Sequence, residues 1–383
     1  MPDTDALFAV LLIKFSGIVL NIIYIGCKLP GSTSRHRADA LSRLGHAVRI
    51  LDPYDKFKDR IDGKILGIFH YRSGYRMLQS DVTEWIESLI HLAIIKSPDV
   101  VWVDSGELLG FNAVKLLSQT GAKLVFYNHD DPTGKRDGHR FDSLLKSLLL
   151  YDLCVVVRHE NIKEYKSLGA RNVMCLWRSY DEIMHAPYKE LLDIPPEFCS
   201  EVAFIGTWMR GEGRDQFVLD LLKRGIPVAI WGQRWEKSPL WGQIKICYRG
   251  GNLSGRDYVA AIQGAKVCLG MLSKGNRDLH TTRSMEIPYA GGVLCAERTS
   301  EHMELYVDGV EAVFWSDAEE CAKQCRRLLD NDAWRESVRS AGMTRVRASQ
   351  RGHEDMCRAV LASALQTQPV QLLQPTSLAA DSR

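Results

Sequence analysis

The sequence predicts an α/β protein of two domains, each with a parallel sheet covered by helices on both faces. Length is the first indication, because 383 residues exceed what one hydrophobic core usually holds and suit two domains of about 150 to 200 residues. The second is a regular alternation of short apolar runs with helical stretches, which is typical of parallel strands joined by crossover helices. The third is a break in this alternation at residues 177–200, which contain three prolines.

These observations divide the chain into an extension, two domains with a linker between them, and a C-terminal segment with a tail. The expected parts are residues 1–19 (extension), 20–176 (first Rossmann-like domain), 177–200 (linker), 201–345 (second Rossmann-like domain), 346–365 (helical segment) and 366–383 (disordered tail, rich in Gln, Pro and Ser). Two such lobes joined by one linker would leave a deep cleft between them.

The N-terminal extension belongs to an apolar run, residues 6–25, that is about as long as a membrane span. However, Lys14 interrupts the run, and Asp3 and Asp5 precede it in place of basic residues. We therefore expect residues 1–19 to extend the first strand or to reflect an ill-chosen start site, and a membrane segment is the alternative.

The first domain opens with a strand, a glycine loop, a capped helix and a second strand, which is a βαβ unit. Polar residues follow two later strands directly, namely Asp104 and the run Asn-His-Asp-Asp-Pro at residues 128–132. Ligands bind outside the carboxyl ends of parallel strands, so these positions are candidates for a site. The expected strands are residues 20–25, 47–52, 100–103, 123–127, 152–157 and 172–176, and the longest expected helices are residues 75–96 and 108–119.

The second domain repeats the pattern and ends in helices. Its expected strands are residues 201–206, 226–232, 244–248, 266–271, 292–296 and 311–315, and its closing helices are residues 317–329, 333–348 and 354–365.

Composition restricts the function. The chain is 45% hydrophobic and 25% charged with a net charge of +2, which gives no argument for nucleic-acid binding. Residues 35–76 carry ten Lys or Arg against five Asp, so this stretch is either a lipid-facing or anion-binding patch or a solvated helix face. The ten cysteines form no CxxC pair and no Cys/His ligand spacing, which indicates buried free thiols in a reducing, cytoplasmic setting and no zinc site.

The strongest local signal is DLHTTRSMEIPYAGGVLCA, residues 278–296. A helix that begins near His280 and stops at Gly291 would direct its N-terminal amides toward the end of the preceding strand, and such an end suits an anion. Asp278 in the loop and Glu286 in the helix would then face one crevice. Taken singly, the two acids can instead be a helix-dipole partner and a solvated helix residue, and the glycines a mere helix stop.

Three segments resemble the GT-B glycosyltransferases, and specifically the CgeB-like (spore-maturation-type) branch of their group 1 family. These are FIGTWMRGEGRD (residues 204–215), IPVAIWGQRW (226–235) and residues 278–315. The resemblance covers most of residues 20–365 and is strong only in the second half. It implies two Rossmann-like domains facing each other across a cleft. It also implies transfer of a sugar from a nucleoside diphosphate to an acceptor hydroxyl, with retention of configuration and without a metal or cofactor.

On this resemblance, Glu286 would hold the ribose hydroxyls and Asp278 would contact the donor sugar. Arg214, with Arg210 beside it, would meet the charge of the departing diphosphate, since guanidinium groups match phosphate oxygens in a bidentate manner. Thr207 departs from the family pattern, which usually has Arg and then Lys here, and the first acid is usually Glu; both departures leave the donor sugar open. The nucleotide-sugar side is completed by Gly206, where backbone can approach closely, and by His280, Thr281 and Arg283 at the expected helix start.

The first domain adds the acceptor side. His129 follows a strand at the edge where a family histidine contacts the donor sugar; the alternative is a turn in which Asp130 or Asp131 bonds the backbone. The adjacent aspartates alone are a weak metal signal, and we expect no metal. Gly31, Ser32 and Arg35 would lie near the acceptor and the diphosphate, or the serine would simply cap a helix.

The expected partners are therefore a nucleotide-sugar donor and a carbohydrate, glycolipid or other hydroxyl acceptor, with peripheral membrane contact as a further alternative. Two other functions fit the same fold: a non-hydrolysing sugar-nucleotide epimerase and a non-catalytic protein that binds nucleotides or carbohydrates. Trp208, Trp231 and Trp235 can stack on a base or sugar, although core packing is the commoner fate of such residues.

Overall fold

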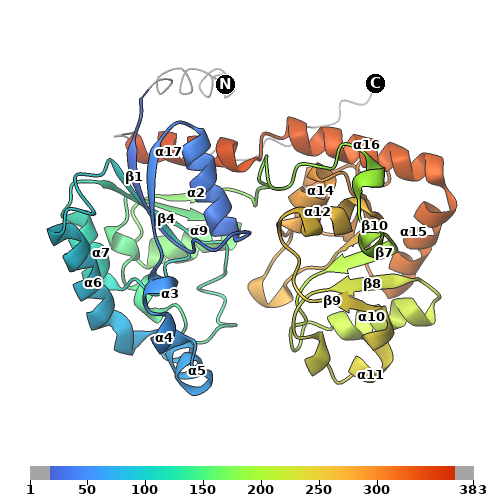
Figure 1. The fold of residues 1–383 in the computed structure, drawn as a ribbon, viewed down its shortest axis with the longest axis horizontal. Coiled ribbons are helices and arrows are strands. Elements are labelled where there is room, and N and C mark those ends of the chain that lie inside the picture. Colours follow the sequence, from blue (N-terminus) through green and yellow to red (C-terminus); the bar gives the residue numbers. More distant parts are fainter. Residues whose placement is uncertain (1–17, 367–383) are drawn as a thin grey trace. The chain divides into compact units, whose positions relative to one another are not determined.

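A computed structural model describes residues 18–366, which form two compact units (Figure 1). Of the described residues, the first unit contains 18–177 and 353–366, and the second unit is Arg178–Gly352. The expected linker, residues 177–200, thus lies almost wholly within the second unit. The predictions for residues 1–17 and 367–383 concern parts of the chain outside the described residues. None of the helices in residues 18–366 combines the length and apolar character that crossing a bilayer requires.

The first unit is built on a six-stranded parallel sheet in the order β2-β1-β3-β4-β5-β6. All six strands were expected from apolar runs, because strands buried on both faces carry little but apolar side chains. The strands are β1 (Asn21–Ile25), β2 (Ala47–Leu51), β3 (Val100–Asp104), β4 (Lys123–Tyr127), β5 (Leu153–Val156) and β6 (Val173–Cys175). The helices are α2 (Thr33–Arg43), α3 (Pro53–Lys56), α4 (Lys58–Ile61), α5 (Lys64–Arg72), η1 (Arg76–Leu78), α6 (Gln79–His91), α7 (Phe111–Ser118), α8 (Asp142–Leu145), η2 (Leu148–Leu150), α9 (His159–Ser167) and α17 (His353–Leu365).

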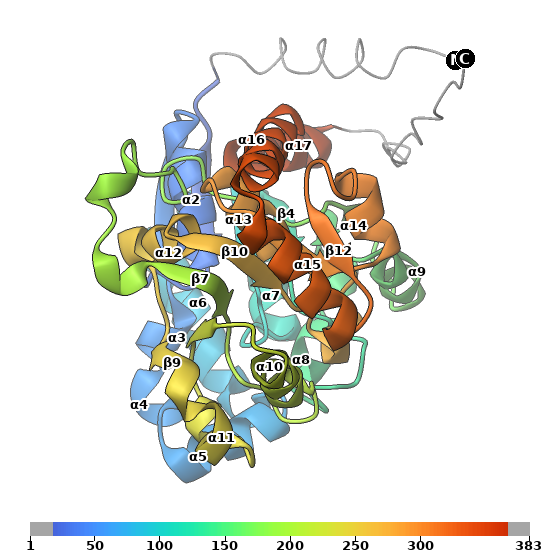
Figure 2. The ribbon, with the colours of Figure 1, turned by 90° about the vertical axis from the view of Figure 1, so that its right-hand side faces the viewer.

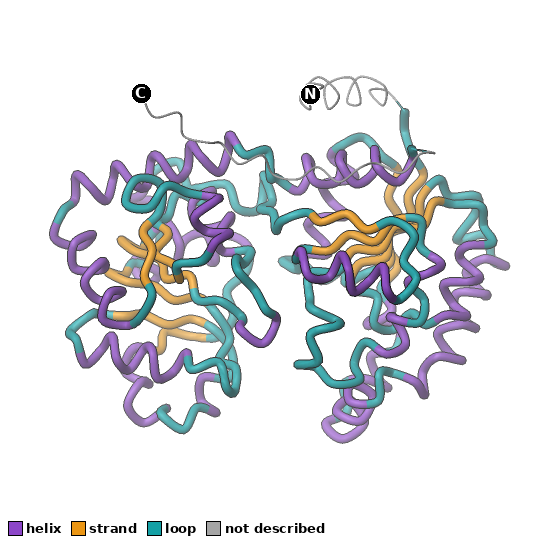
Figure 3. The backbone as a smooth tube through the Cα atoms, turned by 180° about the vertical axis from the view of Figure 1, so that it is seen from behind, coloured by secondary structure: helices purple, strands orange, loops and turns teal. Residues whose placement is uncertain are grey.

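Helices cover both faces of this sheet (Figure 3). On one face α2 and α17 pack beside each other over Tyr24, Trp102 and Tyr127 (Figure 1). On the other face α6, α7 and α9 enclose Phe126. The chain therefore returns at its C-terminal end to complete the first unit, which is why the expected helical segment, residues 346–365, is divided between the two units.

The second unit has its own six-stranded parallel sheet in the order β12-β11-β10-β7-β8-β9. Its strands are β7 (Ser200–Ile205), β8 (Val228–Trp231), β9 (Tyr248–Gly250), β10 (Ala265–Gly270), β11 (Leu294–Glu297) and β12 (Val313–Trp315). Its helices are η3 (Leu191–Asp193), η4 (Pro196–Phe198), α10 (Arg214–Lys223), η5 (Trp235–Lys237), α11 (Trp241–Ile244), η6 (Lys245–Cys247), α12 (Gly255–Gln263), η7 (Lys274–Asn276), α13 (Arg283–Tyr289), α14 (Ser300–Leu305), α15 (Ala318–Asp330) and α16 (Asp332–Ala348).

Helices α10 and α15 lie on one face of this sheet, and α12 and α13 lie on the other (Figure 2). One expected strand is wrong. Residues 244–248 are mostly helical turns, and β9 begins only at Tyr248. Ile244 and Cys247 are buried while Ile246 is exposed, which is helical spacing and not the alternation or continuous burial of a strand.

Candidate functional site

The candidate site lies where the strand order of the second sheet reverses, between β7 and β10. Ligands of open parallel sheets bind outside the carboxyl ends of the strands at such a switch point. Arg214, the first residue of α10, joins the two loops that leave these strands. Its Nη1 donates a hydrogen bond to the carbonyl of Thr207 (2.8 Å) and its Nη2 donates one to the carbonyl of Leu272 (2.8 Å). The guanidinium is therefore fixed at the switch point by two neutral acceptors.

A second guanidinium, that of Arg283, is close enough for its charge to act on Arg214. Arg283 is the first residue of α13 and is half-buried, and it makes no hydrogen bond and no ion pair with any residue that the structure describes. Burial, with the nearby charge of Arg283, lowers the pKa of Arg214. The carboxylates of Glu212, Glu297 and Asp278 act on the pKa of Arg214 in the opposite direction. The Arg214 guanidinium still carries its charge at neutral pH, because guanidinium groups stay protonated in proteins. Among the described residues Arg214 forms an ion pair with none of these three carboxylates, so the two guanidiniums suit an anion.

Glu286 follows Arg283 by three residues on α13, and its carboxylate is buried. One oxygen accepts a hydrogen bond from the hydroxyl of Tyr258 on α12 (2.5 Å), and the other lies 3.7 Å from Nε2 of His185. Burial and the Glu286 charge raise the pKa of Tyr258, so its hydroxyl stays protonated as a donor, while the charge of Arg283 acts in the opposite direction. The charge of Arg283 thus acts on the pKa of both Arg214 and Tyr258, the hydrogen-bond partner of Glu286. We infer that these four side chains share one edge of the sheet.

Asp278 is held by a residue that sequence reasoning placed in the linker. Nη2 of Arg178 donates to Oδ1 of Asp278 (3.0 Å), and its Nη1 donates to the carbonyl of His280 (2.6 Å). The backbone N–H of Arg178 also donates to Nε2 of His280 (3.1 Å), so the other ring nitrogen carries the proton and donates it to Glu301. Burial and the Arg178 charge lower the pKa of His280, in agreement with a neutral ring.

The helix start differs from the expectation. Helix α13 begins at Arg283 and has seven residues, so His280 and Thr281 lie in the preceding loop. The N–H of Thr281 donates to Oγ of Ser284 (3.0 Å), and the N–H groups of residues 284–286 donate to the carbonyls of Thr281 and Thr282. Fewer main-chain donors than expected are left for an anion, because the loop before the helix uses them itself. The attraction of an anion to the start of α13 therefore depends more on the Arg283 guanidinium than on main-chain N–H groups.

The end of α13 is as expected. Gly291 has a φ of +82°, a left-handed conformation that glycine adopts readily, and the helix stops before it. Pro288 lies inside the helix and has no N–H for the carbonyl of Ser284, which instead accepts a hydrogen bond from the hydroxyl of Tyr306 (2.7 Å). A buried tyrosine thus replaces the missing bond.

The loop after β7 is packed tightly against the next strand. Gly206 donates to the carbonyl of Trp231 (2.8 Å), and its own carbonyl accepts from Nε1 of Trp235 (2.8 Å). A Cβ atom at Gly206 would lie 2.8 Å from the ring of Phe204, so the position requires glycine. The tryptophans are buried in the core, which is the alternative left open by the sequence, and Arg210 is exposed.

In the first unit, the glycine loop serves as a helix cap. Gly31 has a φ of +81°, and Oγ of Ser32 accepts the N–H of Arg35 (3.1 Å) at the start of α2. The Arg35 side chain donates to Asp39 one turn later (2.8 Å). The plain capping role of these residues is confirmed, and their contact with an acceptor stays a prediction.

His129 lies at the carboxyl end of β4, as expected, and its carbonyl accepts a hydrogen bond from Arg158 (3.2 Å). The turn that follows is made by Asn128, whose side chain accepts the N–H of Asp130 (2.7 Å). The Asp130 side chain instead pairs with Arg140 (3.1 Å). Asn128 stands at the position whose side chain reaches the backbone two residues on, so it takes part in this turn. The backbone bonds expected of Asp131 and the sugar contact expected of His129 stay predictions.

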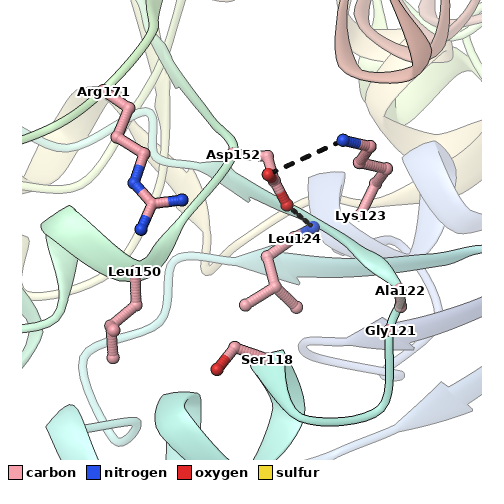
Figure 4. Close-up of a pocket in the computed structure, with 8 residues that line it drawn as sticks. All are labelled: Ser118, Gly121, Ala122, Lys123, Leu124, Leu150, Asp152 and Arg171. Carbon is pink, nitrogen blue, oxygen red and sulfur yellow. Dashed lines mark hydrogen bonds and ion pairs between the residues drawn. The ribbon is translucent and has the colours of Figure 1, made fainter. Parts of the chain in front are cut away.

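Two further features lie away from these edges. A pocket of about 350 Å³ opens at the amino ends of β4 and β5, beside the ion pair of Lys123 and Asp152 (3.8 Å; Figure 4). Three thiols, Cys295, Cys321 and Cys325, lie within 4.8 Å of one another in the apolar core of the second unit. A pocket at the amino edge is on the wrong side of a parallel sheet for the usual ligands, and we assign the thiols to packing.

One family model matches part of the chain by sequence. Residues 213–356, which include most of the switch-point residues, match a family model described as glycosyl transferase-like. No curated protein matches the chain by sequence.

Solved structures share the fold at low identity. A sucrose-phosphate synthase from Thermosynechococcus elongatus has 13% identity and a TM-score of 0.64, over 89% of this chain and 97% of that one. An α,α-trehalose 6-phosphate synthase from Burkholderia multivorans has 14% identity and a TM-score of 0.61, over 91% and 98%. Anabaena Alr3699/HepE in complex with UDP-glucose has 12% identity and a TM-score of 0.59, over 90% and 100%. The predicted fold class, two Rossmann-like α/β domains of the GT-B type, is confirmed.

Proposed function

We propose that this chain is a glycosyltransferase that moves a sugar from a nucleoside diphosphate to an acceptor hydroxyl. The observation that carries the proposal is the pair of neighbouring guanidiniums, Arg214 and Arg283, at the switch point. In sugar transfer the nucleoside diphosphate leaves with the bonding electrons, so negative charge grows on its outer phosphate. Cations already fixed at that place stabilise the transition state without reorganising.

The other residues have roles that follow from their positions. Glu286 would accept hydrogen bonds from the ribose hydroxyls, and Tyr258 orients its carboxylate by donating to one oxygen. Asp278, held by Arg178, would contact the donor sugar. His129 is the candidate of the first unit for contact with the sugar. Retention of configuration, independence from metal and membership of the CgeB-like branch rest on the resemblance of residues 204–215, 226–235 and 278–315.

The complexes and activities of similar structures guide the choice of donor. Alr3699/HepE is described in complex with UDP-glucose, and two other matches are sugar-phosphate synthases. We therefore place uridine diphosphate sugars first in a donor panel, followed by GDP-, ADP- and dTDP-sugars.

Thermal unfolding with each nucleoside diphosphate tests the proposal first, since a ligand that binds only the folded state must raise the melting temperature. The donor that binds is then incubated with and without carbohydrate and glycolipid acceptors. Acceptor-dependent release of the nucleoside diphosphate supports transfer. Conversion of the donor into an isomeric sugar nucleotide without acceptor would show the epimerase instead, and binding without turnover would show a binding protein.

Glu286→Gln supplies the matched variant, because it keeps a hydrogen-bond acceptor for Tyr258 but removes the charge. We expect donor affinity to fall about tenfold or more, since hydrogen bonds to a charged group are worth about 1.5–3 kcal/mol. Glu304→Gln, on the exposed side of α14, is the control that should leave affinity unchanged.

A further inference from the structure

Helix α5 (Lys64–Arg72) turns its apolar side chains away from the protein. Ile65, Leu66, Ile68 and Phe69 are between 49% and 85% exposed, although they are the most apolar residues of the helix. Single exposed apolar residues are ordinary, but four on one short helix form a patch on the order of 400 Å², within the range of functional surface patches. We call these four residues the α5 surface.

The outward orientation is imposed by how the helix is fixed. At about 100° per residue, Gly67, His70 and Tyr71 share the side opposite the α5 surface. A Cβ atom at Gly67 would lie 2.2 Å from the carbonyl of Ile61, so glycine allows close approach to α4. His70 is buried, and the hydroxyl of Tyr71 donates to Asp137 (2.9 Å). The helix therefore cannot turn its apolar side inward without losing these contacts.

Positive charge predominates in the segment that contains the α5 surface. Residues 56–76 contain six Lys or Arg and two acidic residues, Asp59 and Asp62. Of the six cations, Arg60 and Arg76 pair with Asp81 and Asp142. Lys56, Lys58 and Arg72 are exposed. An apolar helix side flanked by cations is complementary to a bilayer with anionic headgroups, where the apolar residues enter the acyl boundary and the cations stay at the phosphates.

We propose that the α5 surface docks the first unit on an anionic lipid bilayer. The alternative of a dimer is less compatible with the patch, because a stable protein interface usually needs about 800 Å² from each partner. Figures 1 and 2 show α5 at one end of the first unit, beyond α3 and α4. The mode of attachment is peripheral, since a helix of nine residues lies on a bilayer and does not cross it.

The position of α5 connects docking with the acceptor side. Helices α3, α4 and α5 follow β2, so they extend from the carboxyl edge of the first sheet. The Arg140 guanidinium lies over the Tyr71 ring (5.3 Å), and Arg140 also pairs with Asp130 in the loop that starts at His129. Docking would bring this edge to the lipid surface, where an acceptor hydroxyl carried by a lipid is presented. Docking itself does not depend on the proposed transfer activity.

Co-sedimentation of the full chain with vesicles tests the proposal. Vesicles of phosphatidylcholine with phosphatidylglycerol are compared with vesicles of phosphatidylcholine alone, at low and at high salt. We expect binding to the anionic vesicles, weakening with salt, and a fall of about tenfold or more in partitioning for the double variant Ile65→Ser/Phe69→Ser. Each variant keeps residues 1–17, so any contribution of that segment is common to all.

The matched control is Leu192→Ser/Ile246→Ser, which removes two strongly exposed apolar side chains from the second unit. It should partition like the unchanged chain, and both double variants should keep their melting temperatures. Absence of vesicle binding, equal loss in both double variants, or a change from dimer to monomer in sedimentation velocity caused by the α5 variant alone would each overturn the proposal.

Discussion

Replacing Arg283 by Gln should stabilise the free protein against unfolding and lower its affinity for the donor. The Arg283 guanidinium makes no hydrogen bond or ion pair with a described residue, so its removal costs no such contact. It stands at the first position of α13, next to the positive end of the helix dipole, and close to Arg214. Removing a cation from a helix N-terminus gains about 0.3–1 kcal/mol, and relief of repulsion adds to this.

The expected gain is large enough to measure. For a domain of this size, about 1 kcal/mol corresponds to about 2–4 °C in melting temperature. With a nucleoside diphosphate present the sign reverses, since each charge-assisted hydrogen bond lost is worth about 1.5–3 kcal/mol, or about 10- to 150-fold in affinity.

Differential scanning calorimetry of the free protein and isothermal titration with the nucleoside diphosphate give the two values. Arg224→Gln at the other end of α10 is the control, because it removes an exposed guanidinium without touching the switch point. A lower melting temperature for Arg283→Gln, together with unchanged affinity, would refute the reasoning, because it would make Arg283 a structural residue.

Three more predictions concern the same unit. Tyr306→Phe should cost about 1–3 kcal/mol in urea unfolding, because the Ser284 carbonyl beside Pro288 loses its donor, whereas Tyr289→Phe, with a half-exposed hydroxyl, should cost less. The contribution of His280 to the free energy of unfolding should be fully present above pH about 6.5 and should be lost as the pH is lowered. The reason is that His280 in the unfolded chain binds a proton near its ordinary pKa, whereas the buried ring, whose pKa is lowered, does not. His280→Gln should flatten this part of the pH profile of stability. Tyr258→Phe should weaken nucleoside affinity several-fold without changing the circular dichroism spectrum. An unchanged affinity would show that the Tyr258 hydroxyl does not orient the Glu286 carboxylate for the ligand.

The strands could be predicted from the sequence because their signal is local. Each of the runs at β1, β3, β4, β7 and β10 is apolar over four or more residues, and a strand buried on both faces needs nothing else. The strand predicted at residues 244–248 was wrong because it rested on the same local signal. A short apolar run does not distinguish a strand from a helical turn.

The candidate site residues differ in how far sequence can suggest them. Asp278 and Glu286 could be proposed because they lie before and within one helix, whereas Arg178 and Tyr258 contact them from distant points in the sequence. The start of α13 was placed too early because Ser284 caps the loop from inside the helix, which sequence spacing does not reveal. The pairings of Arg178 with Asp278 and of Tyr258 with Glu286 join side chains 100 and 28 residues apart, so they depend on the folded backbone.

The most direct test of the central claim is how the affinity for a nucleoside changes with the number of phosphates that it carries. Titration of the chain with a nucleoside, its monophosphate and its diphosphate should show affinity that rises about tenfold or more with each phosphate, and the increase should shrink in Arg214→Gln and Arg283→Gln. Equal affinities for nucleoside and diphosphate, or increases that both variants keep, would contradict an anion site between these two guanidiniums.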